Sequence, residues 1–257
     1  TLYHDLRRFS RQDHADVRLQ PFPGYGFARQ ATELPVRAFE LQQLVPVLPL
    51  AFRLDGEHPK LVGITGVTAG DNIFVGPKGG WNGLATPDVL ETYPFAMERS
   101  GSGKGVLCVD IASDLLNRFE GSPLLDDQGQ PTETLEGYQT KLKAQFKDRQ
   151  ATANAIQALN DAGVLAPWSV DDVETLDGRV HHYVKLPALH GLDQEKQAKL
   201  AQRRALALAY GQAYSMANMR KIRRMAQRKR SAKGDVSQYL KGDDALDFGD
   251  DAVLDFS

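Results

Sequence analysis

The 257-residue sequence contains a single cysteine, Cys108, so no disulfide bond can form within the chain. One cysteine in a chain of this length suits a reducing compartment, and we expect a cytoplasmic protein. Cys108 lies in the apolar segment GVLCVDI, residues 105–111, and a buried thiol in such a strand is usually an inert core residue.

Long hydrophobic runs are also missing. No apolar stretch approaches the roughly 20 residues that a membrane helix requires, so the sequence predicts no membrane span. Residues 1–18 are polar and charged and lack the hydrophobic core of a secretory signal. Both observations agree with a cytoplasmic location.

The familiar spacings of metal-binding and catalytic motifs are absent as well. There is no HxH, HExxH or CxxC, and His181 and His182 are neighbours on a predicted strand, where they point to opposite faces. There is no GxSxG, and SGSGK at residues 100–104 lacks the spacing of a phosphate-binding loop. We therefore expect no metal, no cofactor and no catalytic residue, and we lean away from an enzyme.

What the sequence does have is a strong separation of charge behind a net charge of −2. Residues 201–233 carry ten Lys or Arg and no acid, whereas residues 234–257 carry seven Asp against one Lys. We therefore divide the chain into a folded domain, residues 1–233, and an acidic tail, residues 234–257.

Hydrophobic periodicity and turn residues predict an α+β domain. It would hold a mostly antiparallel sheet, a long central helix and a basic C-terminal helix. The predicted strands cover residues 33–39, 45–54, 105–111, a hairpin of 61–67 with 73–75, and a second hairpin within 164–186 around Asp177-Gly178. The predicted helices cover residues 86–91, 132–159 and 194–230, the last either continuous or broken at Gly211.

Several short motifs occur in a characteristic order along the chain. They are His14 to Arg18 (HADVR), Gly70 to Phe74 (GDNIF), Trp81, Tyr93 to Phe95 (YPF), Cys108 to Asp110 (CVD), Pro123 to Thr132 and Ser215 to Arg220. Together they resemble the bacterial SapC family over residues of about 10–230, with the acidic tail outside the resemblance. The family name implies surface-layer or peptide-transport associations, and the resemblance implies no established catalytic residues.

A ligand site is one functional hypothesis. Asp71, Asn72 and Trp81 surround one predicted hairpin and could line a pocket, and Asp110 ends a strand where it could add a carboxylate. The alternative is structural: Asp and Asn form a tight turn, Trp81 packs on the core, and Asp110 serves as a cap.

The C-terminal charge pattern supports a second hypothesis. The basic helix presents Arg220, Lys221, Arg223, Arg224 and Arg228, and could contact a protein or the phosphates of a nucleic acid. The alternative is a solvated helix end.

The acidic tail repeats the tripeptide Leu-Asp-Phe and is too short to bury its own apolar groups. Its apolar anchors are Leu246, Phe248, Leu254 and Phe256. They could dock on a partner or on the basic helix, with the opposite charges steering the contact. The alternative is a disordered solubilising tail.

Taken together, these patterns favour a non-enzymatic binding or accessory protein that acts through protein–protein contacts of the basic helix and the tail. Small-ligand binding or catalysis at the Asp71–Trp81 hairpin and Asp110 is the first alternative. Nucleic-acid binding is the second.

Overall fold

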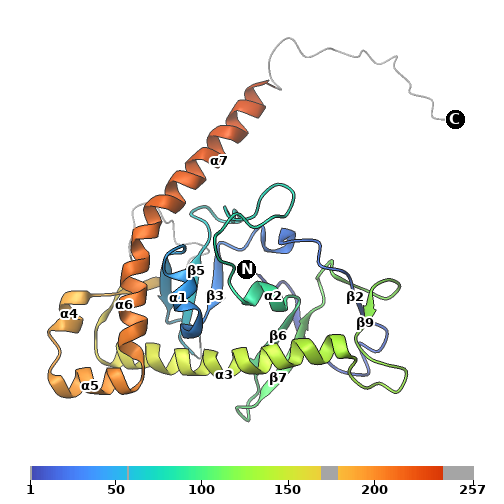
Figure 1. The fold of residues 1–257 in the computed structure, drawn as a ribbon, viewed down its shortest axis with the longest axis horizontal. Coiled ribbons are helices and arrows are strands. Elements are labelled where there is room, and N and C mark those ends of the chain that lie inside the picture. Colours follow the sequence, from blue (N-terminus) through green and yellow to red (C-terminus); the bar gives the residue numbers. More distant parts are fainter. Residues whose placement is uncertain (1, 57, 169–178, 240–257) are drawn as a thin grey trace.

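The computed structural model describes residues 2–56, 58–168 and 179–239. Within this part of the chain the fold is α+β, as predicted: three antiparallel sheets, a long helix and a C-terminal helical region (Figure 1). The sequence predicted one central sheet, whereas the described strands divide among three. No helix among these residues is both long and apolar enough to cross a membrane.

The largest sheet has five strands. Their order is β10 (Leu165–Pro167), β11 (His181–Val184), β4 (Leu50–Arg53), β5 (Lys60–Ile64) and β3 (Glu33–Val36). Because β10 pairs antiparallel with β11, the predicted strand pair within 164–186 is present. Its turn at Asp177-Gly178 lies outside the described residues.

One strand prediction in this region was confirmed only in part, and another was wrong. Residues 45–54 contribute only β4, because Pro46 and Pro49 lack the N–H of a ladder, and helix α1 (Leu41–Leu44) precedes them. Residues 73–75 form no strand with 61–67. Both edges of β5 are already occupied, by β3 and β4, so only single contacts remain, such as Ile73 N–H to Thr65 O at 2.9 Å.

The other two sheets have three strands each. One is ordered β1 (Leu6–Arg8), β7 (Gly105–Asp110) and β6 (Phe95–Arg99), and the other β8 (Leu116–Asn117), β2 (Arg18–Leu19) and β9 (Ser122–Pro123). Strand β7 confirms the prediction for residues 105–111. The 3-10 turns η1 (Gly26–Ala28) and η2 (Ala38–Glu40) connect these parts of the fold.

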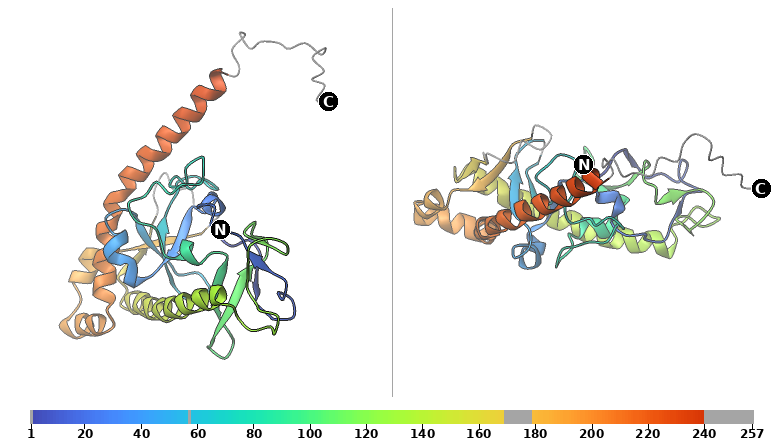
Figure 2. Two further views of the ribbon diagram at one scale, coloured as in Figure 1. Left: turned by 45° about the vertical axis from the view of Figure 1, so that its right-hand side comes forward. Right: turned by 90° about the horizontal axis from the view of Figure 1, so that it is seen from above.

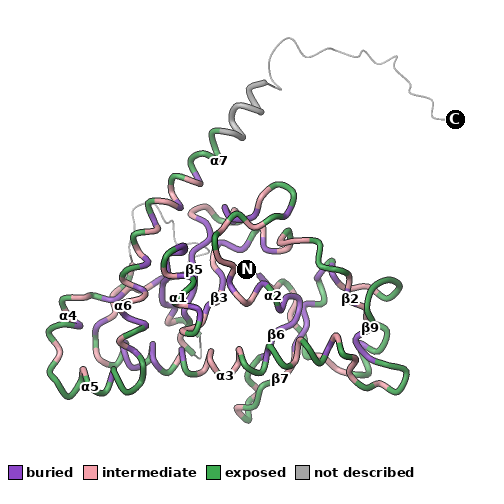
Figure 3. The backbone as a smooth tube through the Cα atoms, in the orientation of Figure 1, coloured by how far each residue is buried: buried purple, intermediate pink, exposed green. Residues whose placement is uncertain are grey.

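Helix α3 (Glu133–Asp161) confirms the predicted long helix. Leu135 and Leu142 in its first half join one hydrophobic core, and Ile156 and Leu159 in its second half join another. Figure 3 shows the helix along its length, and its buried residues fall in both halves, with none between Leu142 and Thr152. The helix therefore connects the two cores. The helix predicted at 86–91 is a single turn, α2 (Val89–Thr92).

The C-terminal region is a chain of helices. They are α4 (Leu186–His190), α5 (Gln194–Gln202), α6 (Ala205–Ser215), the 3-10 turn η4 (Met216–Asn218) and α7 (Met219–Tyr239). Both alternatives for residues 194–230 were wrong: the helical region is neither continuous nor broken at Gly211, because the chain turns at Arg204, which has a φ of 57°, and again at η4. Gly211 instead lies inside α6, where a Cβ would approach Cδ2 of Leu41 to 3.1 Å.

The predicted domain boundary between residues 233 and 234 falls inside α7. Figures 1 and 2 show this helix leading away from the body of the protein. Its first two turns bury Met219, Ile222 and Ala226. The basic helix is therefore anchored at its beginning and extends outward.

Candidate functional site

Asn72, a predicted ligand residue, is fully buried and holds the backbone around it. Its side-chain amide donates to the carbonyl of Ala28 at 3.0 Å, and its Oδ1 accepts the N–H of Phe74 at 3.0 Å. Its own N–H donates to the carbonyl of Arg29 at 2.9 Å. These bonds tie the turn to the segment after η1, which agrees with the structural alternative.

Asp110 is also fully buried, at the end of β7. Its two carboxylate oxygens accept the backbone N–H groups of His4 at 3.0 Å and Asp5 at 2.9 Å. The hydroxyl of Tyr93 donates to Oδ2 at 3.3 Å. Asp110 thereby fixes the chain that enters β1, and it shares none of these partners with Asn72.

Trp81 packs between aromatic rings. Its ring stacks on Phe74 with centroids 5.2 Å apart and lies 5.7 Å from Tyr25, and Nε1–H donates to the carbonyl of Ala85 at 2.9 Å. Asp71 alone of the four faces a charged group, since its Oδ1 lies 2.6 Å from Nζ of Lys229 on α7. The four predicted ligand residues therefore do not converge on one pocket.

The basic helix presents a stripe of arginines. Arg220, Arg224 and Arg228 are exposed and lie four residues apart, which places them on one face of α7. None of the three pairs with a carboxylate among the residues that the structure describes. Lys221, Arg223 and Lys229 are partly buried at the sides of the helix. The tail anchors Leu246, Phe248, Leu254 and Phe256 lie outside the described residues.

A buried ionic cluster lies on the five-stranded sheet. His181 Nε2 contacts Glu33 Oε2 at 2.7 Å, and Arg53 pairs with Glu33 and Asp55. Strands β4 and β5 lie between β11 and β3. In a flat sheet with 4.8 Å between neighbouring strands, β3 and β11 would be about 14 Å apart. Their side chains can meet only because the sheet curves.

The charges in this cluster shift one another's ionisation. Burial alone would raise the pKa of Glu33, but the hydrogen bond from His181 and the positive charges of Arg53 and Arg179 lower it. The hydrogen bond from Arg53 lowers the pKa of Asp55 in the same way. Among the residues that the structure describes, no nucleophile contacts His181, and we interpret the cluster as structural.

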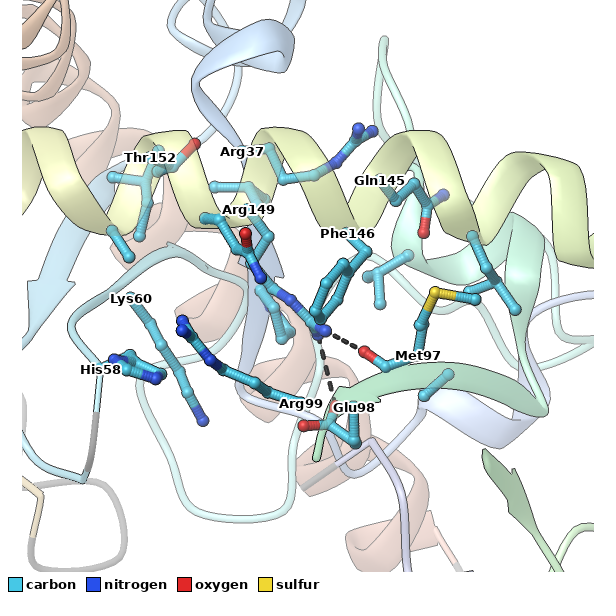
Figure 4. Close-up of a pocket in the computed structure, with 18 of the residues that line it drawn as sticks. Arg37, His58, Lys60, Met97, Glu98, Arg99, Gln145, Phe146, Arg149 and Thr152 are labelled. Carbon is cyan, nitrogen blue, oxygen red and sulfur yellow. Dashed lines mark hydrogen bonds and ion pairs between the residues drawn. The ribbon is translucent and has the colours of Figure 1, made fainter. Parts of the chain in front are cut away.

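A cavity of about 600 Å³ lies beneath α3, and the sequence did not predict it. Its walls come from β6, from β3 and from the beginning of β5. The lining includes the cationic side chains of Arg37, His58 (when protonated), Lys60, Arg99 and Arg149, with Glu98 as the carboxylate. Figure 4 shows these side chains around the space under the helix.

Two of these cations are engaged by the protein. Arg37 pairs with Glu40 at 3.1 Å, with Asp88, and with Asp148 at 3.8 Å. Arg149 donates to the carbonyl of Met97 and lies 3.3 Å from Glu98, and its guanidinium stands 5.6 Å from the ring centroid of Phe146. Lys60 and Arg99 form no side-chain ion pair with any residue that the structure describes.

No local signal could have identified this cavity. Its cations come from four separate elements: Arg37 is the N-cap of η2, Lys60 begins β5, Arg99 ends β6 and Arg149 lies in the middle of α3. In the sequence, each of them looks like an ordinary surface cation. Among the described residues, no three His, Cys, Asp or Glu side chains are grouped so that they could hold a metal ion. Burial raises the pKa of Cys108, which makes its thiolate scarcer.

The fold thus defines an α+β protein of antiparallel sheets bound together by one long helix. The sequence model of SapC matches residues 9–222, and the chain belongs to the SapC family. The resemblance seen in the motifs is thereby confirmed, although Arg223, Arg224 and Arg228 lie beyond the matched residues. Searches among curated proteins and among solved structures found no match.

Proposed function

We propose that this protein is a non-enzymatic cytoplasmic binding or accessory protein that acts through protein contacts, with the arginine stripe of α7 as its principal surface. The observation that supports this is the exposed row Arg220, Arg224 and Arg228. At 1.5 Å per residue the row is about 12 Å long. Three exposed guanidinium groups at this spacing, none paired with a carboxylate of the described residues, suit an acidic protein surface.

The geometry of α7 favours a contact surface over a solvated helix end. Ile222 and Ala226 hold one side of the helix on the core while the arginines face outward. Lys229 and Arg230 contact the loop at residues 68–72, at Asp71 and Thr68 respectively. A helix fixed in this way presents its arginines in one orientation, which lowers the entropy lost on binding.

The small-ligand alternative at Asp71, Asn72, Trp81 and Asp110 has less support. Asn72 and Asp110 direct their polar atoms at backbone groups, and Trp81 donates its indole N–H to Ala85. Each of these contacts has a structural purpose. The remaining residue, Asp71, contacts Lys229.

The test is affinity capture from native lysate with the full-length chain. We expect a defined set of proteins that is lost with R220Q/R224Q/R228Q. It should be retained with K143Q/K147Q, which removes two exposed cations from α3. The captured amount should fall with salt, because exposed charges are screened. If R220Q/R224Q/R228Q captured the same proteins in the same amounts as K143Q/K147Q and the wild type, the proposal would be contradicted. The proposal would also be contradicted if the wild type bound duplex DNA more tightly than it binds the captured proteins, with a steep dependence on salt.

The tail enters this proposal through its aspartates and the anchors Phe248 and Phe256. If it docks on α7 of the same chain, F248A/F256A should raise amide exchange in residues 220–230. If it docks on a partner, the same variant should reduce capture instead. Unchanged exchange together with unchanged capture would remove the tail from the proposal and leave the arginine stripe.

A further inference from the structure

The cavity beneath α3 has the size of a small-molecule site. Its volume is about 600 Å³, within the range of roughly 300–1,000 Å³ that is typical of ligand pockets. It is independent of the arginine stripe, because none of its lining residues comes from α7. A ligand here would be a property separate from the protein contacts proposed above.

One part of the lining is apolar. Phe146 is half-buried and is the accessible apolar side chain of this part, whereas Met97, Leu61 and Leu142 complete the lining but are themselves buried. Figure 4 shows Phe146, Met97 and Gln145 at one end of the cavity. Such a surface suits the hydrocarbon part of a ligand, which gains from leaving water.

The opposite end is cationic. His58, Lys60 and Arg99 are exposed and line the cavity at its solvent side. Figure 4 shows them on the side of Arg149 that is away from Met97 and Gln145. Lys60 and Arg99 lack an ion-pair partner within the described chain, whereas Arg37 already has three carboxylates around it. Cations without a carboxylate partner at the edge of an apolar cavity attract an anion.

We propose that this cavity binds a small amphipathic carboxylate, with its carboxylate held by Lys60 and Arg99 and its hydrocarbon part lying against Met97, Phe146 and Leu142. A guanidinium and an ammonium group both form charge-assisted hydrogen bonds to a carboxylate. Arg149 is already bound to Met97 O and Glu98, and it acts as the wall between the polar and apolar ends.

Titration calorimetry of the full-length protein tests this proposal with three probes: octanoate, 1-octanol and inorganic phosphate. We expect octanoate to bind one to one, and 1-octanol and phosphate to bind about tenfold or more weakly, because each lacks one half of the recognised chemistry. Octanol that binds as tightly as octanoate would overturn the role of the cations. Phosphate that binds as tightly would reveal a simple anion site and overturn the amphipathic ligand.

Variants locate the site. K60Q/R99Q should weaken octanoate binding about tenfold or more and leave 1-octanol unchanged. The matched control K143Q/K147Q, on exposed positions of α3 outside the cavity, should bind octanoate as the wild type does. A153M places a longer side chain from α3 into the cavity and should weaken both probes. Wild-type affinity in both K60Q/R99Q and A153M would overturn the proposal.

Discussion

Nζ of Lys229 lies 2.6 Å from Oδ1 of Asp71 and 3.2 Å from the carbonyl oxygen of Asn72. The contact joins the basic helix to the loop that the sequence suggested as a ligand site. Asp71 therefore fixes α7 at the point where the helix leaves the body of the protein.

This relationship predicts the effect of D71N. Loss of the ion pair should increase amide exchange in residues 226–233 of α7, because the helix loses its contact with the loop. Global stability should fall by about 1 kcal/mol or less, since both side chains are 27% exposed. The matched control is E91Q, which removes the exposed pair with Lys141 and should leave exchange in α7 unchanged. Equal exchange in wild type and D71N would show that the pair does not hold the helix.

Asn72 provides a second prediction. N72A removes the donor to Ala28 O and the acceptor of Phe74 N–H in a fully buried place. The free energy of unfolding should fall by about 2–4 kcal/mol, because two buried polar groups lose their partner. Chemical denaturation measures this. K143A, at an exposed position of α3, should change stability by less than about 0.5 kcal/mol. If N72A lowered the free energy of unfolding by as little as the control does, the structural role of Asn72 would be contradicted.

The ionic cluster around Glu33 predicts a pH dependence of stability. The pKa of Glu33 in the folded protein lies below its ordinary value of 4.5, so the folded state holds fewer protons on this group than the unfolded state. Its contribution to stability is present above pH 4.5 and is lost as the pH falls through the lower, folded pKa. Asp55, whose pKa is also lowered, acts in the same direction.

E33Q tests this origin of the acid sensitivity. Denaturation at a series of pH values should show a shallower loss of stability below pH 4.5 in E33Q than in the wild type. E120Q, at an exposed position, should keep the wild-type slope. The same slope in all three proteins would assign the acid sensitivity to other groups.

Two helical glycines give a matched pair. A Cβ at Gly137 in α3 would meet nothing within 4 Å, whereas at Gly211 in α6 it would lie 3.1 Å from Leu41 and 3.4 Å from Val45. G137A should stabilise the protein by about 0.5–1 kcal/mol, the usual gain of alanine in a helix. G211A should gain less, and G211L should be destabilising, because α6 could no longer approach α1. Equal gains from both alanine variants would contradict this close packing.

The sequence predicted the parts of the fold that local periodicity determines. Helix α3 begins after Thr132 and ends before Gly163, and strand β7 is a continuous apolar run. It could not predict which strands pair. Residues 73–75 resemble the return strand of a hairpin, but β3 and β4 occupy both edges of β5. Such competition depends on segments far apart in the chain.

The candidate sites show the same division. Asp71 and Trp81 were expected to surround one hairpin, but residues 61–67 and 73–75 do not form it, and Trp81 packs against Tyr25 and Phe74. Asp110 was added to them only as another polar residue after a strand, and its partners are His4 and Asp5. The cavity was missed because Lys60, Arg99 and Arg149 meet only after a sheet and a helix pack together.

Helix α3 supplies Leu135 and Leu142 to one hydrophobic core and Ile156 and Leu159 to the other. During synthesis, the strands that precede residue 133 leave the ribosome before the helix that covers them exists. Their apolar faces remain open to solvent, or to a chaperone, until residues 133–161 have been made. The core that contains Ile156 and Leu159 also needs Val184, Leu208 and Ile222, so it closes only after the C-terminal helices have been made.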